Sequence, residues 1–521
     1  MPALLQVQRG RLPYLFTCRI RKLISNFLSV RLFCKNSLSG EEACVGFYFP
    51  IMDRFRIRIK ELLTILFMMH FFIYTQIARY SGFSGKMDGL RMFLLRVILL
   101  GIGIQNAVSA QTLQQAFADV QALCTNEMAG RGYQDNGHGK AAQFISGRFA
   151  ALGLEPWQPQ AVEGRKDWYQ GFQFQVNLVD SVALSVNRKK LQPGKDFIVH
   201  GLSGSASGAF RVAHLDYGMG EDWEAGKVTG KATMLRLGFP PHYEQNEKNQ
   251  QMFMPQTKLA FKLEMANIYR PALMILCKDK LTAGFGTQAL PYALLEVRNE
   301  ALPPKPQKLE AYIKTSLQTI NAYNVMACIP GGKYPDSLII VSAHYDHLGR
   351  QGEAVFRGAN DNASGVAFML GLAGYLAELE TPPDYTVVFI AFGAEEVGLK
   401  GSTHWVQQVD SSLLKRVRFM LNFDLMGNGD EGICLVAGEE FPDLAARIKK
   451  QLPSEYPIEI RPNAPNSDHY PFVRAGVPAI FTYTKGGPPW YHDVMDTPDA
   501  VKFPSWNLLL NTYARVILHN P

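Results

Sequence analysis

Between residues 337 and 518, apolar runs typical of buried strands alternate with longer runs of helical periodicity. The strand-like runs are SLIIVSAHYD, TVVFIAFGAEE, RFMLNFDLMG and VPAIFTYT, and the helical runs include ASGVAFMLGLAGYLAEL and PSWNLLLNTYARVIL. Strands that alternate with helices favour a largely parallel sheet with helices on both faces. The predicted fold class is therefore α/β, with a mainly parallel mixed sheet.

Side chains that bind metals lie where these apolar runs give way to polar turns. In chain order they are His344, Asp361, Glu395 with Glu396, Asp424 and His492. In open α/β sheets, ligands bind outside the carboxyl ends of the strands, so we expect these side chains to converge on one rim of the sheet. Imidazole and carboxylate ligands suit zinc. The order and spacing fit a two-zinc hydrolase with one spare carboxylate.

Two local patterns indicate different roles within this set. Asp361 lies in the Gly-rich run RGANDNASG just before a helix, where the backbone can present its carboxylate as a bridge between two ions. Glu395 and Glu396 are adjacent, so they cannot easily bind one metal in the same way. One of them can bind while the other stays free to take a proton from water.

Six motifs in this part of the chain resemble a known family. SAHYDHLG, GANDNASG, FGAEEVGLKGS, NFDLMG, NSDHYPFVRAGVPAI and YHDVMDTPD look like the successive motifs of the co-catalytic double-zinc exopeptidases, metallopeptidase family 28. That family includes bacterial aminopeptidases and glutamate carboxypeptidases. The resemblance implies two Zn²⁺ ions per chain, one held by His344, Asp361 and Asp424 and the other by Asp361, Glu396 and His492. It also implies that Glu395 is the general base.

The residues around the predicted ligands are expected to support them. Asp346, two residues after His344, is predicted to accept the second ring N–H of that histidine and so fix its tautomer. The resemblance further implies a cis peptide bond between Asp361 and Asn362. Tyr491 is a candidate donor to the developing oxyanion, with Tyr483 as the alternative. Three further histidines are predicted to support the site or the fold rather than to bind metal: His347, His404 and His469.

The residues before the alternating region follow a different pattern. Helical runs near residues 113–126 and 139–154 come first, and Gly153 is expected to end the second. Residues 172–307 then carry short β-type runs separated by Gly, Pro and Asn. Within them, DWEAGKVTGKATMLRLG and KLAFKLEMANIYRPALMILC resemble the protease-associated domain that is inserted in several exported peptidases. A smaller β-rich inserted domain is therefore predicted, with a peptidase domain formed by residues 111–171 and 308–521.

The N-terminal region has the features of a leader sequence. From Met87 the chain has Arg91 and Arg96, an apolar stretch and the small residues that end at Ala110, which predicts a signal peptide at 87–110 and an exported protein. Residues 1–86 are interpreted as a doubtful upstream extension, and membrane attachment is expected only if they are retained. The first 110 residues hold 15 of the 53 Lys and Arg but 5 of the 46 Asp and Glu, so the remainder is near −3 and no nucleic-acid partner is suggested.

The cysteines do not form a zinc-site pattern. Those outside the leader are Cys124, Cys277, Cys328 and Cys434, with no CxxC pair, and they are predicted to be buried free thiols.

Three functions are compatible with the motifs. The favoured one is an exported aminopeptidase that acts on peptide substrates. Glutaminyl cyclases share the histidine, the glutamate pair and a stretch much like DHYPFVRAGVP, but they use one zinc; NDNASG and the inserted region favour the peptidases. A non-catalytic receptor-like relative ranks last because every expected ligand is present. Carboxypeptidase action stays open, since no residue identifies itself as the anchor for a substrate terminus, and the oligomeric state is not predicted.

Overall fold

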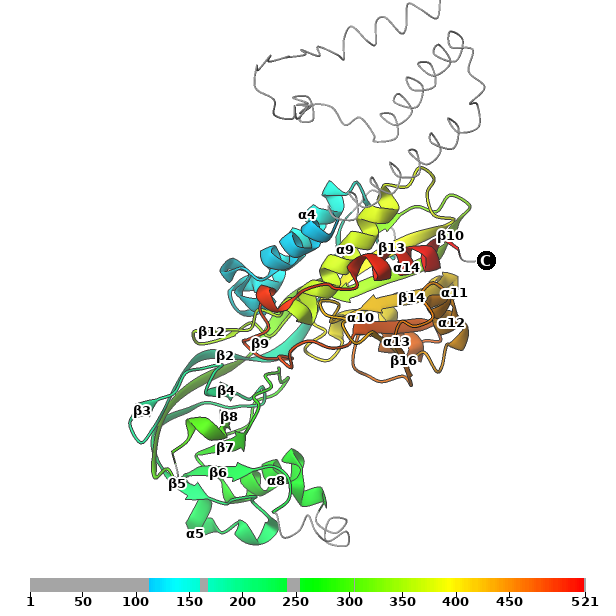
Figure 1. Ribbon diagram of the computed structural model, residues 1–521. Helices are drawn as coiled ribbons and strands as arrows, with labels where there is room; N and C mark the ends of the chain where they lie inside the picture. The colour runs from blue at the N-terminus through cyan, green and yellow to red at the C-terminus, as the bar shows by residue number, and fades with distance from the viewer. Residues whose placement is uncertain (1–111, 160–166, 241–253, 304, 520–521) are drawn as a thin grey trace, which may run out of the picture. The chain divides into compact units, whose positions relative to one another are not determined.

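The computed structural model describes residues 112–159, 167–240, 254–303 and 305–519, all of which belong to one compact unit, Arg96–Pro521 (Figure 1). The predicted extension, the signal peptide and its cleavage after Ala110 lie outside the described residues. Among the described helices, none has the length and apolar character needed to cross a membrane.

The strands of a central mixed sheet come from the C-terminal half of this unit. Its strands, in spatial order, are β16 (Ile458–Arg461), β15 (Ile433–Val436), β17 (Ala479–Thr484), β14 (Val417–Phe423), β10 (Tyr334–His344), β13 (Tyr385–Phe392) and β9 (Lys308–Ile329). β10 lies parallel to both β13 and β14, and β14 is parallel to β17. β9 and β15 enter antiparallel to β13 and β17. The predicted mainly parallel mixed sheet is confirmed.

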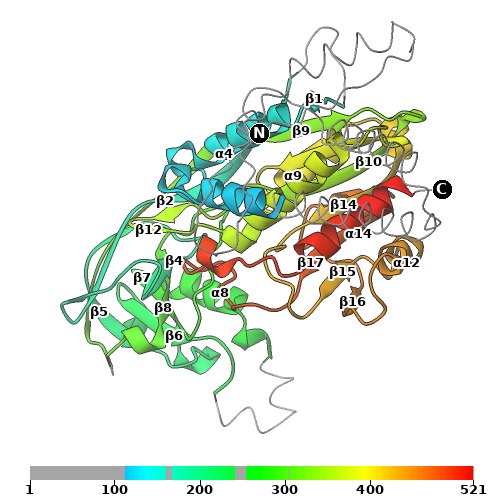
Figure 2. The ribbon, with the colours of Figure 1, turned by 45° about the horizontal axis from the view of Figure 1, so that its top comes forward.

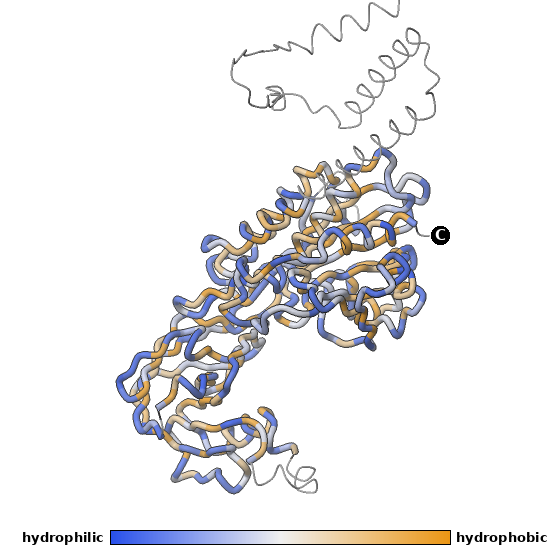
Figure 3. Tube along the Cα trace, in the orientation of Figure 1, coloured by the Kyte–Doolittle hydropathy of each residue, from blue (hydrophilic) through white to orange (hydrophobic). Residues whose placement is uncertain are grey.

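Helices cover both faces of this sheet. Residues 112–123, α4 (Gly137–Ala151), α9 (Ser364–Ala377), α12 (Pro442–Lys450) and α14 (Trp506–Leu518) form the first core with one face, whereas α10 (Lys400–Gln408), α11 (Ser411–Arg416) and α13 (His469–Arg474) pack on the other. Figure 2 shows α4, α9 and α14 on the same side of the sheet. Alternate side chains of β10 point to opposite cores: Ile339 and Val341 to the first, Leu338 and Ile340 to the second. Figure 3 shows hydrophobic residues along the strands and mixed character along the helices.

The N-terminal helix ends where its sequence indicates. α4 stops at Ala151, and Gly153 takes the left-handed conformation with φ +76°. The amide of Leu154 then bonds to the carbonyl of Phe149 at 3.1 Å, which closes the helix end in a Schellman-type turn.

A long antiparallel ribbon extends from the central sheet. β2 (Tyr169–Val186) pairs with β9 along its whole length, and β5 (Ala206–His214) also pairs with β9. Beyond it the strands run in the order β6 (Ala232–Arg236), β7 (Leu273–Lys278), β8 (Ala293–Arg298) and β4 (Phe197–Val199), with α8 (Leu259–Tyr269) packed against them. These strands have apolar clusters of their own. Because β2 begins before residue 172, its ladder crosses the predicted domain boundary without a break.

The remaining elements are short. They are η1 (Asn126–Arg131), η2 (Gln134–Asn136), β1 (Glu155–Pro156), β3 (Lys189–Lys190), η3 (Gly220–Asp222), α5 (Ala225–Val228), η4 (Met254–Thr257), η5 (Asn299–Ala301), β11 (Arg350–Gln351), β12 (Ala354–Val355), η6 (Ala359–Ala363) and η7 (Pro498–Ala500). None of the four described cysteines forms a disulfide; Cys277 is half-buried and the other three are buried, close to the prediction.

Candidate metal centre

The parallel strands bring the predicted ligands to one edge of the sheet. His344 is the last residue of β10, Asp424 directly follows β14, and Glu395 and Glu396 lie in the turn after β13. Asp361 comes from η6, a turn that leads into α9, and His492 comes from the loop between β17 and η7. The carboxyl ends of parallel strands meet at the same edge, which explains how residues so distant in sequence converge.

Asp361 lies between two pairs of side chains, each made of one histidine and one carboxylate. Nε2 of His344 lies 3.4 Å from Oδ1 of Asp361 and 3.4 Å from Oδ2 of Asp424. Nε2 of His492 lies 3.3 Å from Oδ2 of Asp361 and 3.1 Å from Oε2 of Glu396. The two oxygens of Asp361 therefore face different histidines, as a bridging carboxylate requires.

Unpartnered oxygens show that these residues fit metal ions. Oδ2 of Asp361 and Oδ1 of Asp424 are buried without a hydrogen-bond partner, which is unfavourable for a carboxylate unless a cation lies beside it. Ligand atoms of His344, Asp361 and Asp424 all lie within 4.8 Å of one another. Imidazole nitrogens together with carboxylate oxygens form a donor set that zinc accepts.

A second histidine contacts Glu396. Nδ1 of His347 lies 2.7 Å from Oε1 of Glu396, while His492 faces the other oxygen of the same carboxylate. Ligand atoms of His347, Asp361 and Glu396 also lie within 4.8 Å of one another. His347 was expected only to support the site, and it does so by direct contact with a predicted ligand.

The backbone around Asp361 is held by side chains from distant parts of the chain. The Asp361–Asn362 peptide bond is cis, as the motif resemblance implied. The carboxylate of Asp496 accepts the amide of Asn360 at 2.9 Å and the amide of Asp361 at 3.0 Å. The side-chain amide of Asn362 donates to the carbonyl of Phe423 at 3.1 Å. Asp496 belongs to the YHDVMDTPD motif, but sequence reasoning gave it no role.

A buried arginine fixes the same turn from the other side. Arg131 has no exposed surface, and its guanidinium donates to several main-chain carbonyls around the site and to Sγ of Cys124 at 3.8 Å. The acceptors include those of Tyr345 at 2.8 Å, Gly358 at 2.7 Å and Asp361 at 3.2 Å. Sequence reasoning missed Arg131 because it lies in η1, more than 200 residues before the turn that it holds.

Asp346 holds the glutamate turn rather than the histidine ring. The backbone carbonyl of Asp346 lies 3.2 Å from Nδ1 of His344, closer than its carboxylate at 3.8 Å. The carboxylate accepts the amides of Glu395 at 3.1 Å and Glu396 at 3.3 Å, and the hydroxyl of Tyr133 at 2.8 Å. The tautomer of His344 is therefore set mainly by a main-chain acceptor, which differs from the expected role of this carboxylate.

The adjacent glutamates have opposite electrostatic environments. Burial, opposed by His344 and reinforced by Asp468 and Glu396, holds the pKa of Glu395 well above its usual range. Burial also acts to raise the pKa of Glu396, but the contacts with His492 and His347 together outweigh it and lower the pKa to about 2. Glu395 therefore has the higher proton affinity of the two, and Glu396 favours the ionised form that a ligand needs.

Sequence reasoning also missed a buried acid beside Glu395. Asp468 is fully buried, and burial raises its pKa to about 7. It precedes His469 in the SDHYPF run. His469 itself is buried against Phe481 and is not among the residues that line the cavity over the site. His404 stacks on Phe172, so the two histidines have structural environments.

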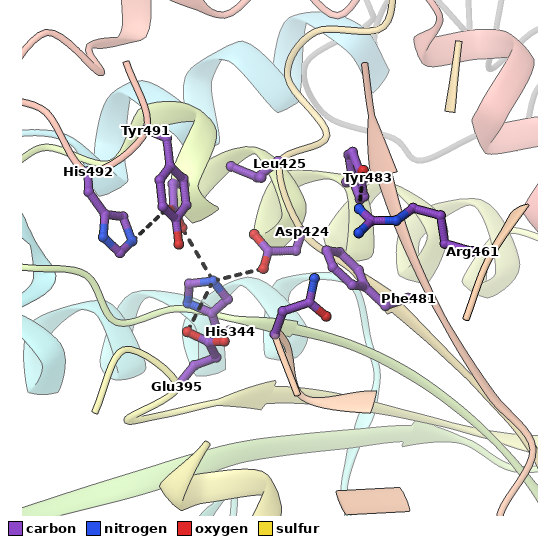
Figure 4. A pocket seen from close by; sticks show the side chains of 11 residues that line it. His344, Glu395, Asp424, Leu425, Arg461, Phe481, Tyr483, Tyr491 and His492 are labelled. Atoms are coloured by element: carbon purple, nitrogen blue, oxygen red, sulfur yellow. Dashed lines mark hydrogen bonds and ion pairs between the residues drawn. The ribbon is translucent and has the colours of Figure 1, made fainter. Parts of the chain in front are cut away.

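A cavity of about 220 Å³ opens over the predicted ligands. Figure 4 shows Tyr491 and His492 on one side, Tyr483 and Arg461 on the other, and His344 with Asp424 between them. The Tyr491 ring stacks on His492 with centroids 3.8 Å apart. The hydroxyl of Tyr483 instead accepts a hydrogen bond from Arg461 at 3.2 Å. Further wall residues are Leu425, Asn466 and Phe481.

Residues 324–517, which include every predicted ligand and Glu395, match peptidase family M28. The chain carries an M28 peptidase domain. This assignment agrees with the motif resemblance and places the metal centre inside the matched segment.

Curated relatives and solved structures are consistent with the M28 domain. Aminopeptidase YwaD of Bacillus subtilis is 32% identical over 206 residues, 37% of this chain and 42% of that protein. A glutamate carboxypeptidase 2 homolog of Caenorhabditis briggsae is 30% identical over 37% of this chain and 28% of that protein. The matched segments thus span less than half of either relative.

The folds of two solved aminopeptidases match over most of this chain. BSAP, a zinc aminopeptidase from Bacillus subtilis, superposes with a TM-score of 0.57 at 20% identity and covers 78% of this chain and 94% of that one. The aminopeptidase from Aneurinibacillus sp. strain AM-1 gives 0.55 at 22% identity, covering 79% and 94%. At these identities the likeness establishes a shared fold.

Proposed function

We propose that this protein is a two-zinc exopeptidase that removes N-terminal residues from peptides. The observation that carries the proposal is the geometry of Asp361, whose two oxygens face separate pairs of histidine and carboxylate side chains. His344 and Asp424 would hold one ion with Asp361, and Glu396 and His492 would hold the other. Bound zinc supplies a Lewis acid that polarises a carbonyl and lowers the pKa of water.

Glu395 is the proposed general base. Its Oε2 lies 4.0 Å from Nε2 of His344, so it borders the ligands without sharing the position of Glu396. The pKa of its carboxyl group is held above the usual range, which suits a group that takes a proton from water and returns it to the leaving amine. Asp346 positions both glutamates through their amides.

Tyr491 is the proposed donor to the developing oxyanion. Desolvation of its hydroxyl and then the carboxylates of Asp361 and Glu396 raise its pKa although the residue is half exposed, so the hydroxyl keeps the proton that it must donate. Tyr483 is the weaker candidate, because it lies beside Arg461 on the side of Asp424 away from His492 (Figure 4).

Action at the N-terminus is supported by the similar proteins that are named as aminopeptidases. Arg461 on the cavity wall favours carboxypeptidase action as a second candidate, because a guanidinium binds carboxylates. The paired oxygens of Asp361 support two ions and count against a single-zinc cyclase.

The finer features of the protein belong to the same proposal. We infer that the signal peptide at residues 87–110 exports the enzyme, and that residues 172–307 form a protease-associated-like insertion in the peptidase domain. Peptides are the proposed partners. The short β-type runs of this region and its own apolar clusters support the insertion.

The reaction can be tested with aminoacyl-anilide substrates and a peptide library. We expect release of N-terminal residues, loss of activity with a chelator, and recovery with zinc. Glu395→Gln should retain zinc and lower kcat by about 10²–10⁴-fold, the usual contribution of a general base. Unchanged turnover in this variant would contradict the assigned base. Release of C-terminal residues would favour the carboxypeptidase, and cyclisation of N-terminal glutamine with one zinc would favour the cyclase.

A further inference from the structure

His492 is presented by a loop rather than by a strand end. His344, Glu396 and Asp424 lie at or just beyond strand ends, whereas His492 lies in a loop with the left-handed φ of +57°. Its side chain remains 13% exposed, compared with 1% for His344. A ligand in such a loop is held only as well as its neighbours hold the loop.

The neighbour that contacts His492 most closely is Ala283, between β7 and β8. Nδ1 of His492 lies 2.8 Å from the carbonyl oxygen of Ala283, and the amide of Ala283 donates back to the carbonyl of His492 at 3.2 Å. A carbonyl oxygen can only accept, so Nδ1 carries the proton. Nε2, which faces Asp361 and Glu396, is then left with the lone pair that a metal ligand requires.

An ion pair secures the next residue of the loop. Nη2 of Arg298, at the end of β8, lies 3.3 Å from Oδ2 of Asp493, whose side chain is only 5% exposed. The same guanidinium donates to the carbonyls of Lys195 at 2.9 Å and Asp279 at 3.3 Å. Arg298 therefore ties the histidine loop to the start of the segment that carries Ala283.

Apolar packing completes the contact. Leu281 and Ala283 are buried in one cluster with Leu348 and Phe356, and Val494 packs against it. Leu348 directly follows the SAHYDH residues of the metal centre. This cluster therefore joins residues 279–285 to the segment that carries His344 and to the loop that carries His492.

We propose that residues 279–285 and Arg298, which lie within residues 172–307, form a bracket that positions His492 for the second zinc. This inference rests on the two-metal centre proposed above. Arg298 is a positioning residue: it touches neither the metal nor the substrate and acts through Asp493 and the loop. The region 172–307 would then be a structural part of the metal centre, and it would control one ion rather than both.

Zinc affinities of the full protein test the bracket. The apo protein is titrated with zinc against a chromogenic chelator, and native mass spectrometry counts the ions. Arg298→Gln should raise the Kd of the second zinc by about 10–100-fold, the usual effect of losing a group that orients a ligand, and change the first by less than threefold. Arg298→Lys should recover most of the affinity, because it restores the charge opposite Asp493. Leu281→Ala, which opens the apolar cluster, should produce the same selective loss.

The control variant removes an ion pair that lies on the β2–β9 ribbon instead. Lys314→Gln breaks the pair between Lys314 and Asp180 on the β2–β9 ribbon, away from the loop, and should leave both affinities unchanged. Equal weakening of both zincs, or no change in either, in Arg298→Gln and Leu281→Ala would overturn the bracket. A wild-type protein that binds only one zinc would overturn the two-metal centre and the bracket with it. Since the readout is metal binding, a failure to hydrolyse aminoacyl anilides would leave the bracket standing while refuting the proposed reaction.

Discussion

Oδ1 of Asp346 accepts the backbone amide of Glu395 at 3.1 Å, so a residue of the β10 turn fixes the residue that we propose as the base. Its other oxygen accepts the amide of Glu396. One buried carboxylate thus sets the position of the proposed base and of a proposed ligand relative to His344, two residues before it.

Replacing Asp346 by Asn should damage catalysis and metal binding together. The amide group can present only one oxygen, so its NH₂ would face the amide of Glu395 or Glu396 and repel that turn. We expect a fall of about 100-fold in kcat, consistent with a displacement of the base by about 1 Å, and zinc binding weaker by about 10–100-fold. Steady-state kinetics and zinc titration measure both effects.

The matched control for Asp346 is Tyr133→Phe. It removes only the hydroxyl that donates to Asp346 and leaves both amide contacts in place. Stability should fall by about 1–2 kcal/mol, with kcat reduced less than tenfold. Wild-type kcat in Asp346→Asn would show that the two amide contacts do not position the base.

Tyr491→Phe should distinguish the roles of the two tyrosines that line the cavity. Removal of one oxyanion donor typically lowers kcat by about 10²–10³-fold, and KM should change little because the ring still stacks on His492. Tyr483→Phe should keep kcat within threefold, since Tyr483 lies beside Arg461 on the side of Asp424 away from His492 (Figure 4). A larger loss of kcat in Tyr483→Phe would reverse the assignment.

Much of the site could be predicted because its residues end strands of a regular sheet. A buried run followed by His344, or by Asp424, places the side chain at a known edge once the strands are parallel. The cis bond after Asp361 was accessible only through the resemblance of the motifs. Periodicity contains no information about it.

The rest depends on contacts between residues far apart in the chain. Arg131 reaches the carbonyl of Asp361 across 230 positions, and Ala283 reaches His492 across 209. Ala283 makes this contact through its main-chain atoms, which do not depend on the residue type, so composition cannot reveal it. The ribbon of β2 and β9 was missed for a related reason, because its strands are long, partly exposed and paired over more than a hundred residues.

Arg461→Gln should change substrate preference rather than the chemical step. Arg461 lies at the exposed end of β16, and it is the one lysine or arginine among the described residues that line the cavity. Its guanidinium would bind a substrate carboxylate, so the variant should lower kcat/KM for glutamyl anilides by about tenfold or more and leave leucyl anilides within threefold. Peptides with free and amidated C-termini distinguish a side-chain carboxylate from a terminal one.

Arg474→Gln is the control for Arg461, because it removes an exposed positive charge from the end of α13 outside the cavity lining. It should change neither class of substrate. If Arg461→Gln lowered kcat/KM equally for glutamyl and leucyl anilides, the arginine would not be a carboxylate anchor.

His200 should make the β-rich region sensitive to acid. Burial lowers the pKa of its ring to about 4, and the neutral Nδ1 accepts the amide of Leu202 at 3.1 Å. The unfolded chain, with a histidine pKa near 6.5, binds the proton more readily, so the stabilisation is full above about pH 6.5 and is lost as pH falls toward 4. The loss is on the order of 3 kcal/mol. His200→Asn keeps an acceptor without titrating, so its thermal midpoint should fall less than that of the wild type between pH 7 and 4.5; parallel curves would contradict the assignment.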